Sequence, residues 1–111
     1  MKTIVFGYSS NPERYSYMAS ELLSQYGHEV VNINPREESG IEKLKMGCDT
    51  LTLYVSAQIS DKYQERLLGL KPRRVIFNPG TENSDLQKKF ETLGVDVVVG
   101  CTLVMLRTHQ F

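Results

Sequence analysis

Five short apolar runs, each bounded by turn residues and rich in valine, isoleucine or threonine, recur along the 111 residues of the chain. They span residues 3–8, 29–34, 50–55, 74–78 and 95–100. Apolar, β-branched runs of about four to eight residues are typical of buried β-strands. The segments between them carry apolar residues at helical spacing, so the sequence predicts strands that alternate with helices.

The segment after the first run is the clearest helix prediction. Its apolar side chains recur at helical steps from Tyr15 to Tyr26, and Gly27 follows as a C-terminal stop. The start of this helix is open between Asn11 and Ser16 as the N-cap. We favour Ser16, because the periodic apolar face begins there.

Two more helices are expected further along the chain. One runs over residues 60–68, where apolar side chains share a face and Gly69 follows. The other begins at Asn83 or Ser84 and ends at residue 93; Ser84 and Gln87 stand at the spacing of a capping box. Both segments end before a glycine, which is a usual C-terminal signal.

Residues 36–48 are expected to form a loop with one or two helical turns, and the tail 101–111 a short final helix. Strands alternating with helices imply right-handed crossovers and a parallel sheet covered on both faces. We therefore predict an α/β fold, a three-layer Rossmann-like domain with a five-stranded parallel sheet in the order 3-2-1-4-5. Residues 1–111 are expected to form a single domain.

Composition excludes several classes of function. Thirteen Lys and Arg balance thirteen Asp and Glu, so no global field attracts nucleic acid or an anionic membrane. With 41% hydrophobic and 23% charged residues, the chain should fold alone or as a small oligomer. A homodimer or an unidentified protein partner stays open.

The cysteines and the hydropathy pattern bear on location. Cys48 and Cys101 lie far apart, without a CxxC pair or a neighbouring His cluster, so neither a disulfide framework nor a metal site is expected. No apolar stretch approaches the ~20 residues of a membrane helix, and the first run is short for a secretory signal. We expect a cytoplasmic protein that is neither exported nor embedded in a membrane.

Ligands of such sheets bind at the carboxyl ends of the strands, near the point where the strand order reverses. After the first strand comes "GYSSNPER". Gly7 permits a tight exit, and the hydroxyls of Ser9 and Ser10 offer donors to a phosphate. Arg14 would add a charge-assisted contact worth about 1.5–3 kcal/mol. A polar turn whose serines satisfy backbone groups is the alternative.

The end of the second strand discriminates between nucleotides. An NAD site usually has an acidic residue there that binds the ribose 2′-hydroxyl. This chain has "NINPR" at that place, which contains no acidic residue. Arg36 suits a nucleotide with an extra ribose phosphate, since a guanidinium binds phosphate in a two-pronged geometry. NADP carries this phosphate at the 2′ position and coenzyme A carries it at the 3′ position. An exposed arginine without a ligand is the alternative.

Three stretches together resemble a known family: "FGYSSNPERYSYMASELLSQYGHEVVNINPR", "RVIFNPGTEN" and "CTLVMLR". They are similar to the small single-domain CoA-binding proteins, which are themselves similar to the CoA-binding domain of the succinyl-CoA synthetase alpha subunit. The likeness covers nearly the whole chain in order. Family members usually have Gln-Pro-Gly after strand four, where this chain has Asn78 in place of the glutamine.

The resemblance implies coenzyme A or an acyl-CoA as the cofactor and assigns parts of the molecule to parts of the chain. The first loop would lie along the pyrophosphate, and residues 34–36 would face the adenosine and its 3′-phosphate. Residues 55–56 would border the adenine, and residues 78–80 would line the route of the pantetheine arm. The candidate cofactor-binding residues are Gly7, Ser9, Ser10, Asn11, Arg14, Tyr17, Asn34, Pro35, Arg36, Val55, Ser56, Asn78, Pro79 and Gly80.

No catalytic constellation can be read from the sequence. Cys101 follows the fifth strand, where an inert core thiol is the favoured interpretation. His28 and His109 have no visible partner carboxylate. Whether the chain is an enzyme stays open, and a binding module for a small-molecule nucleotide is favoured. The alternatives are an NADP-dependent enzyme and a protein-interaction module that uses a Rossmann scaffold without nucleotide.

Overall fold

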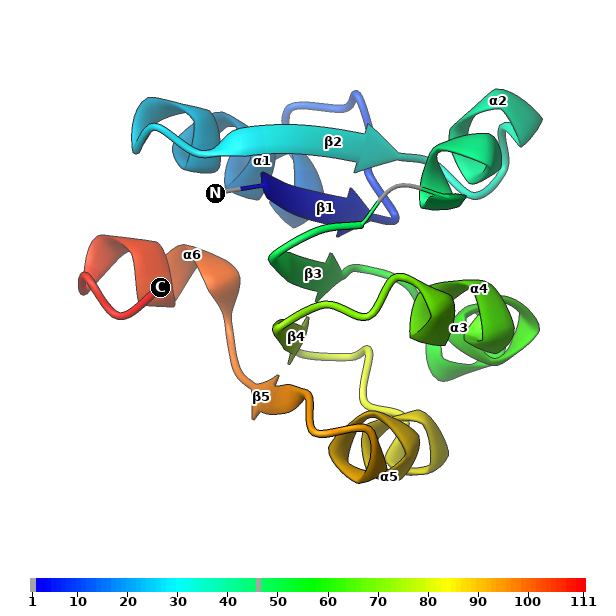
Figure 1. Ribbon diagram of the computed structural model, residues 1–111. Helices are drawn as coiled ribbons and strands as arrows, with labels where there is room; N and C mark the ends of the chain where they lie inside the picture. The colour runs from blue at the N-terminus through cyan, green and yellow to red at the C-terminus, as the bar shows by residue number, and fades with distance from the viewer. Residues whose placement is uncertain (1, 46) are drawn as a thin grey trace.

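Five parallel strands form one sheet in a computed structural model that describes residues 2–45 and 47–111 (Figure 1). The strands occupy the five predicted runs. Their bounds are β1 Lys2–Phe6, β2 Glu29–Ile33, β3 Thr50–Leu53, β4 Arg74–Phe77 and β5 Asp96–Val99. The α/β, Rossmann-like class predicted from the alternation of apolar runs is therefore confirmed.

Helical segments connect and follow these strands. Their bounds are α1 Tyr15–Gln25, α2 Glu38–Ile41, the 3-10 helix η1 Glu42–Lys45, α3 Ala57–Lys62, α4 Gln64–Gly69, α5 Ser84–Thr92 and α6 Thr102–Arg107. The helix expected over residues 60–68 is in fact two helices that meet at Tyr63. The Tyr63 ring packs edge-on against Phe6, 5.8 Å between centroids, and its backbone there is not helical.

Helices cover both faces of the sheet. On one face Val5 of β1 packs with Leu23 of α1 and Leu106 of α6. On the other face the neighbouring strand residues Ile4 and Phe6 belong to a larger core, together with side chains from η1, α4 and α5. Figure 1 shows α6 on one side of the sheet and α3, α4 and α5 on the other. Alternate side chains along each strand thus pack into two apolar layers, one on each face of the sheet.

The strand order is β2-β1-β3-β4-β5, whereas the sequence led us to expect 3-2-1-4-5. β3 lies beside β1 rather than outside β2. The chain moves one way from β1 to β2 and then returns past β1 to reach β3. Because both crossovers are right-handed, this reversal puts α1 on one face and the β2–β3 connection on the other. The apolar pattern of the sequence does not show on which side of β1 the third strand is added.

Candidate functional site

A cleft of about 510 Å³ opens at the carboxyl ends of β1 to β4. It brings together most of the candidate residues from four separate stretches of sequence. The candidates that line it are Gly7, Ser9, Arg14, Asn34, Pro35, Arg36, Val55, Ser56, Pro79 and Gly80. The cleft lies where β2 and β3 flank β1, which is the switch point of the sheet.

Strand register aligns the exits that form this cleft. Phe6, the last residue of β1, pairs with Ile33 on one side and Leu53 on the other. The backbone N–H of Gly7 then donates to the Ile33 carbonyl at 2.8 Å, which turns the chain at once after β1. Gly7 adopts a φ of 102°, in the region that favours glycine. This turn leaves the first loop above the sheet edge.

Side chains of the first loop and of the start of α1 accept hydrogen bonds from the loop backbone. Ser16 Oγ accepts from the Ser9 N–H at 3.1 Å, and Ser9 Oγ accepts from the Asn11 N–H at 3.1 Å. Asn11 Oδ1 in turn accepts from the Glu13 N–H at 3.0 Å. The loop is thus held in shape by its own side chains. Neither Ser10 nor Asn11 is among the residues that line the cleft.

The N-cap of α1 is Arg14, so the expectation that Ser16 caps this helix is wrong. Arg14 has an extended backbone and makes no capping hydrogen bond through its side chain. Ser16 lies inside the first turn, where its hydroxyl serves the loop instead. The arginine side chain consequently stays available at the cleft wall.

Two guanidinium groups give the cleft its charge. Arg14 and Arg36 line it, and no acidic residue does so within the described part of the chain. In that same part the ion pairs are Arg73–Asp49 and Lys89–Asp85, so neither cleft arginine is paired. The turn that carries Arg36 is fixed, because Asn34 Oδ1 accepts from the Arg36 N–H at 2.9 Å. A site of this kind attracts anions.

Asn78 and Tyr17 have structural partners outside the cleft. Asn78 is 2% exposed, and its amide donates to Thr52 Oγ1 and to the Leu53 carbonyl while its Oδ1 accepts from the Thr102 N–H. Tyr17 stacks on Tyr8, with 6.3 Å between ring centroids. Neither side chain lines the cleft.

Five residues that line the cleft were not among the candidates: Tyr15, Ser16, Tyr54, Ile59 and Thr81. Tyr15 is the most prominent, because this residue is 70% exposed although its side chain is large and aromatic. Its position next to Arg14, a candidate binding residue, is the sequence feature that could have indicated a place in the cleft. Tyr54 is different, since burial raises its pKa to about 12 and keeps the phenol neutral.

A second recess of about 800 Å³ borders the cleft and shares Pro35 and Arg36 with it. The hydroxyl of Tyr63 donates to the Pro35 carbonyl at 3.4 Å between the two hollows. Besides Pro35, Arg36 and Tyr63, the residues that line this second recess are Ile41, Glu42, Asp61, Lys62, Gln64, Glu65, Arg66 and Lys89. The recess is therefore mostly charged, and its charges are of both signs.

Residues 1–107 match the family model of the CoA binding domain. The chain belongs to this family. The match spans nearly the whole sequence and includes every loop that forms the cleft. Membership confirms the resemblance seen in the three motifs, and it supports a small-molecule ligand of the CoA type in general.

Solved structures share the fold. A crystal structure described as an uncharacterized protein is 38% identical, with a TM-score of 0.89, and covers 99% of this chain and 97% of its own. A protein from Thermus thermophilus is 22% identical, with a TM-score of 0.84, over 99% of this chain and 90% of its own. One from Pyrococcus horikoshii is 20% identical, with a TM-score of 0.81, over 98% and 82%. A search of curated proteins found no match.

The cysteines and His28 of this CoA-binding domain lack the surroundings that activate a catalytic side chain. Cys101 is half-buried at the start of α6 and does not line the cleft. Burial raises the pKa of the Cys48 thiol to about 11, which keeps it protonated. The pKa of His28 is lowered chiefly by burial, and its ring packs against Phe111.

Residues 2–45 and 47–111 contain neither a cluster of metal ligands nor a helix that could cross a membrane. No cluster of His, Cys, Asp and Glu in these ranges could hold a metal ion. None of the helices that they form has the length and apolar character needed to cross a membrane. The cleft with its two arginines is therefore the candidate binding site.

Proposed function

We propose that this CoA-binding domain holds coenzyme A or an acyl-CoA in the cleft at the carboxyl ends of β1 to β4. The observation that carries the proposal is a pair of guanidinium groups, Arg14 and Arg36, that have no ion-pair partner and share a cleft without acidic side chains among the residues that the structure describes. The formal net charge of the chain is zero, so this concentration of positive charge is local. Coenzyme A carries two separate anionic groups, a pyrophosphate and a 3′-phosphate, that match two cationic positions.

The two arginines stand at the exits of neighbouring strands, which suggests the direction of the ligand. We propose that the pyrophosphate lies beside Gly7, Ser9 and Arg14, and that the 3′-phosphate lies on Arg36. Val55 and Ser56 border the adenine, and Pro79 and Gly80 border the pantetheine arm. The amide of Asn78 supports this wall from inside the protein, because its hydrogen bonds are committed to Thr52, Leu53 and Thr102.

We further propose a binding role in the cytoplasm rather than catalysis. The cleft is lined by backbone, hydroxyl, amide, apolar and arginine groups, and burial raises the pKa of Tyr54 to about 12, which keeps its phenol neutral. Such a set recognises a phosphorylated ligand without supplying a nucleophile and a base. A homodimer or a protein partner that senses the bound state is compatible with this role.

Titration calorimetry with four ligands tests the proposal. Coenzyme A should bind more tightly than dephospho-CoA, because only the former has the 3′-phosphate that Arg36 contacts. NADP and NAD should bind more weakly than coenzyme A. Arg36→Ala should weaken coenzyme A by about 1–3 kcal/mol, and should leave dephospho-CoA almost unchanged.

Arg107→Ala is the matched control, since Arg107 is exposed at the end of α6 and does not line the cleft. It should bind all four ligands like the unmodified protein. Equal binding of coenzyme A and dephospho-CoA would contradict the role of Arg36. Binding of none of the four would overturn the proposed function itself, and would favour a Rossmann scaffold used for protein interaction.

A further inference from the structure

We propose that Tyr15 stacks on the adenine ring of the bound nucleotide, and so makes the site selective for ligands that carry a base. This inference rests on the proposed function and adds to it the residue that recognises the base. Tyr15 is the first residue of α1 and lines the cleft beside Arg14. None of the four strand exits supplies an aromatic ring that is as exposed.

Tyr15 is a large aromatic residue that lies exposed at the cleft. The residue is 70% exposed, the highest value among the large hydrophobic residues in the described part of the chain. An exposed aromatic ring leaves apolar area in contact with water, and a ligand that covers the ring removes that area. An exposed ring in a cleft is thus suited to a flat, apolar partner.

The other tyrosines have packing roles that account for them. Tyr8 and Tyr17 stack on each other, Tyr26 stacks on His109, and Tyr63 packs on Phe6. Tyr54 is partly buried and packs against the cluster of Val5, Leu23 and Leu106. Within the described residues, Tyr15 has no aromatic partner and is not buried, so packing does not account for a tyrosine at this position.

The charges around the cleft restrict where the base can lie. In coenzyme A the base and the 3′-phosphate are attached to one ribose, so a phosphate on Arg36 keeps the base near that arginine. Arg36 borders both the cleft and the second recess. The recess is lined by seven charged residues, and its Tyr63 ring already packs on Phe6 and lies under Lys62 Nζ, 5.6 Å from the ring centroid. The cleft, with Tyr15, is the more apolar choice for a base.

Three ligands separate base recognition from the rest of the molecule. Coenzyme A has both the base and the pantetheine arm, adenosine 3′,5′-bisphosphate has only the base end, and 4′-phosphopantetheine has only the arm. Tyr15→Ala should weaken binding of coenzyme A and of adenosine 3′,5′-bisphosphate by about 5- to 150-fold, the range that loss of a base–aromatic stack produces. The same variant should bind 4′-phosphopantetheine like the unmodified protein.

Two further variants serve as controls. Tyr15→Phe keeps the ring and should restore binding of all three ligands to within about twofold, because stacking does not need the hydroxyl. Tyr26→Ala removes another exposed tyrosine, 45% exposed at the opposite end of α1, and should leave all three affinities unchanged. Circular dichroism of each variant checks that the fold is intact.

A spectroscopic readout tests contact directly. The chain contains no tryptophan, so Tyr15→Trp introduces a single reporter at the cleft. Adenosine 3′,5′-bisphosphate should quench its fluorescence in proportion to binding, whereas 4′-phosphopantetheine should not. Tyr26→Trp should show no change with either ligand.

The outcomes separate this inference from the proposed function. If the unmodified protein binds neither coenzyme A nor adenosine 3′,5′-bisphosphate, the proposed function fails and the inference fails with it. If both bind and Tyr15→Ala binds them equally well, only the inference is overturned. A loss confined to coenzyme A and 4′-phosphopantetheine would also overturn it, because Tyr15 would then contact the pantetheine arm.

Discussion

The side-chain amide of Asn78 donates to the hydroxyl of Thr52 across 2.7 Å, between the ends of the neighbouring strands β4 and β3. The same amide donates to the Leu53 carbonyl at 2.9 Å, and Asn78 Oδ1 accepts from the Thr102 N–H at the start of α6. One buried side chain thus joins two strand exits and a helix. It fixes the wall beside the cleft from inside the sheet.

We expect Asn78→Ala to lower the free energy of unfolding by about 1–3 kcal/mol, because the Leu53 carbonyl and the Thr102 N–H would lose a partner in a buried place. Urea unfolding followed by circular dichroism measures the change. Gln58→Ala, at an exposed amide on α3, is the control and should change stability by less than about 0.5 kcal/mol. An Asn78→Ala protein as stable as the control would contradict the structural role.

Gly7→Ala should be strongly destabilising, by about 2–5 kcal/mol, through backbone strain and crowding. The φ of 102° is unfavourable for alanine, and a Cβ there would lie 2.7 Å from Val55 Cγ1 and 2.8 Å from the Tyr54 carbonyl. Gly69→Ala is the matched control, because Gly69 ends α4 with nothing within 4 Å of its Cβ position. It should stabilise the protein by about 0.4–1 kcal/mol. Thermal unfolding of the two variants compares them, and equal shifts would refute the argument.

Much of this fold could be predicted from local sequence alone. The apolar runs located β1 to β5, since a buried parallel strand needs both faces apolar and therefore leaves a continuous signal. Knowledge of where parallel strands end then located most of the cleft, because the register brings Gly7, Asn34 and Val55 to one edge. Arg36 could be singled out for the same reason.

Other features depend on contacts between distant residues, and these could not be predicted. The position of β3 beside β1 depends on the direction of a crossover, which leaves no periodic signal. Tyr63, where α3 and α4 meet, packs against Phe6, which is far away in the sequence. Asn78 follows a strand like the other candidates, but its orientation toward Thr52 is a property of the folded sheet. Ser16 satisfies the usual N-cap pattern and yet serves the Ser9 amide.

Asp49 should make the stability of the protein depend on pH in the acid range. Hydrogen bonding from Arg73, at 2.8 Å, is the main cause that lowers the pKa of Asp49 from its ordinary value of 3.8. The unfolded chain therefore takes up this proton at a higher pH than the folded protein. The stabilisation is complete above about pH 4 and is lost as the pH falls through the lowered pKa of the folded state.

Unfolding measured between pH 2 and pH 7, for example at about unit intervals, tests the role of Asp49. Asp49→Asn should make the decline in stability at acid pH shallower than in the unmodified protein. Arg73→Gln should have the same effect, and the double variant should be no shallower than either single variant, because both changes remove one interaction. If the free energy of unfolding of Asp49→Asn falls with acid pH as steeply as that of the unmodified protein, the Asp49 carboxylate does not cause the fall.

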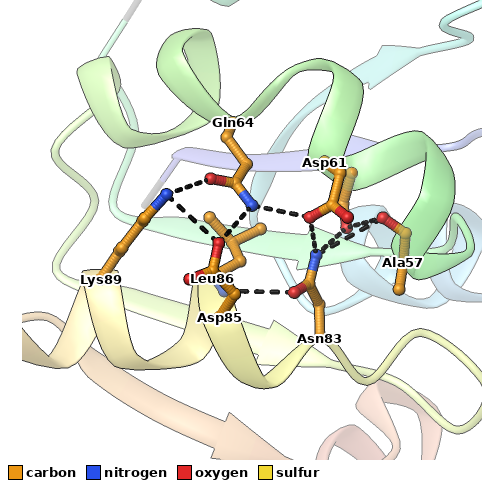
Figure 2. Close-up of polar contacts among 8 residues, drawn as sticks. Ala57, Asp61, Gln64, Asn83, Asp85, Leu86 and Lys89 are labelled. Carbon is orange, nitrogen blue, oxygen red and sulfur yellow. Dashed lines mark hydrogen bonds and ion pairs between the residues drawn. The ribbon is translucent and has the colours of Figure 1, made fainter.

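The start of α5 provides a last test, because the sequence left Asn83 and Ser84 as alternative first residues. Asn83 is the N-cap: its Oδ1 accepts from the Leu86 N–H at 3.2 Å, and Gln87 Oε1 accepts from the Asn83 N–H at 3.1 Å. Figure 2 shows the Asn83 amide directed toward Asp61 and Ala57 of α3, with Asp61 Oδ1 2.8 Å from Nδ2. This side chain therefore caps one helix and attaches it to another.

Asn83→Ala should lower the free energy of unfolding by about 1–3 kcal/mol, since it removes the cap and leaves buried groups without partners. Ser84→Ala should change it by less than about 0.5 kcal/mol, because Ser84 is exposed and its side chain does not cap α5. Urea unfolding of the two neighbouring variants under identical conditions gives the comparison. A larger loss in Ser84→Ala than in Asn83→Ala would assign the cap to the serine and would remove the structural link between α5 and α3.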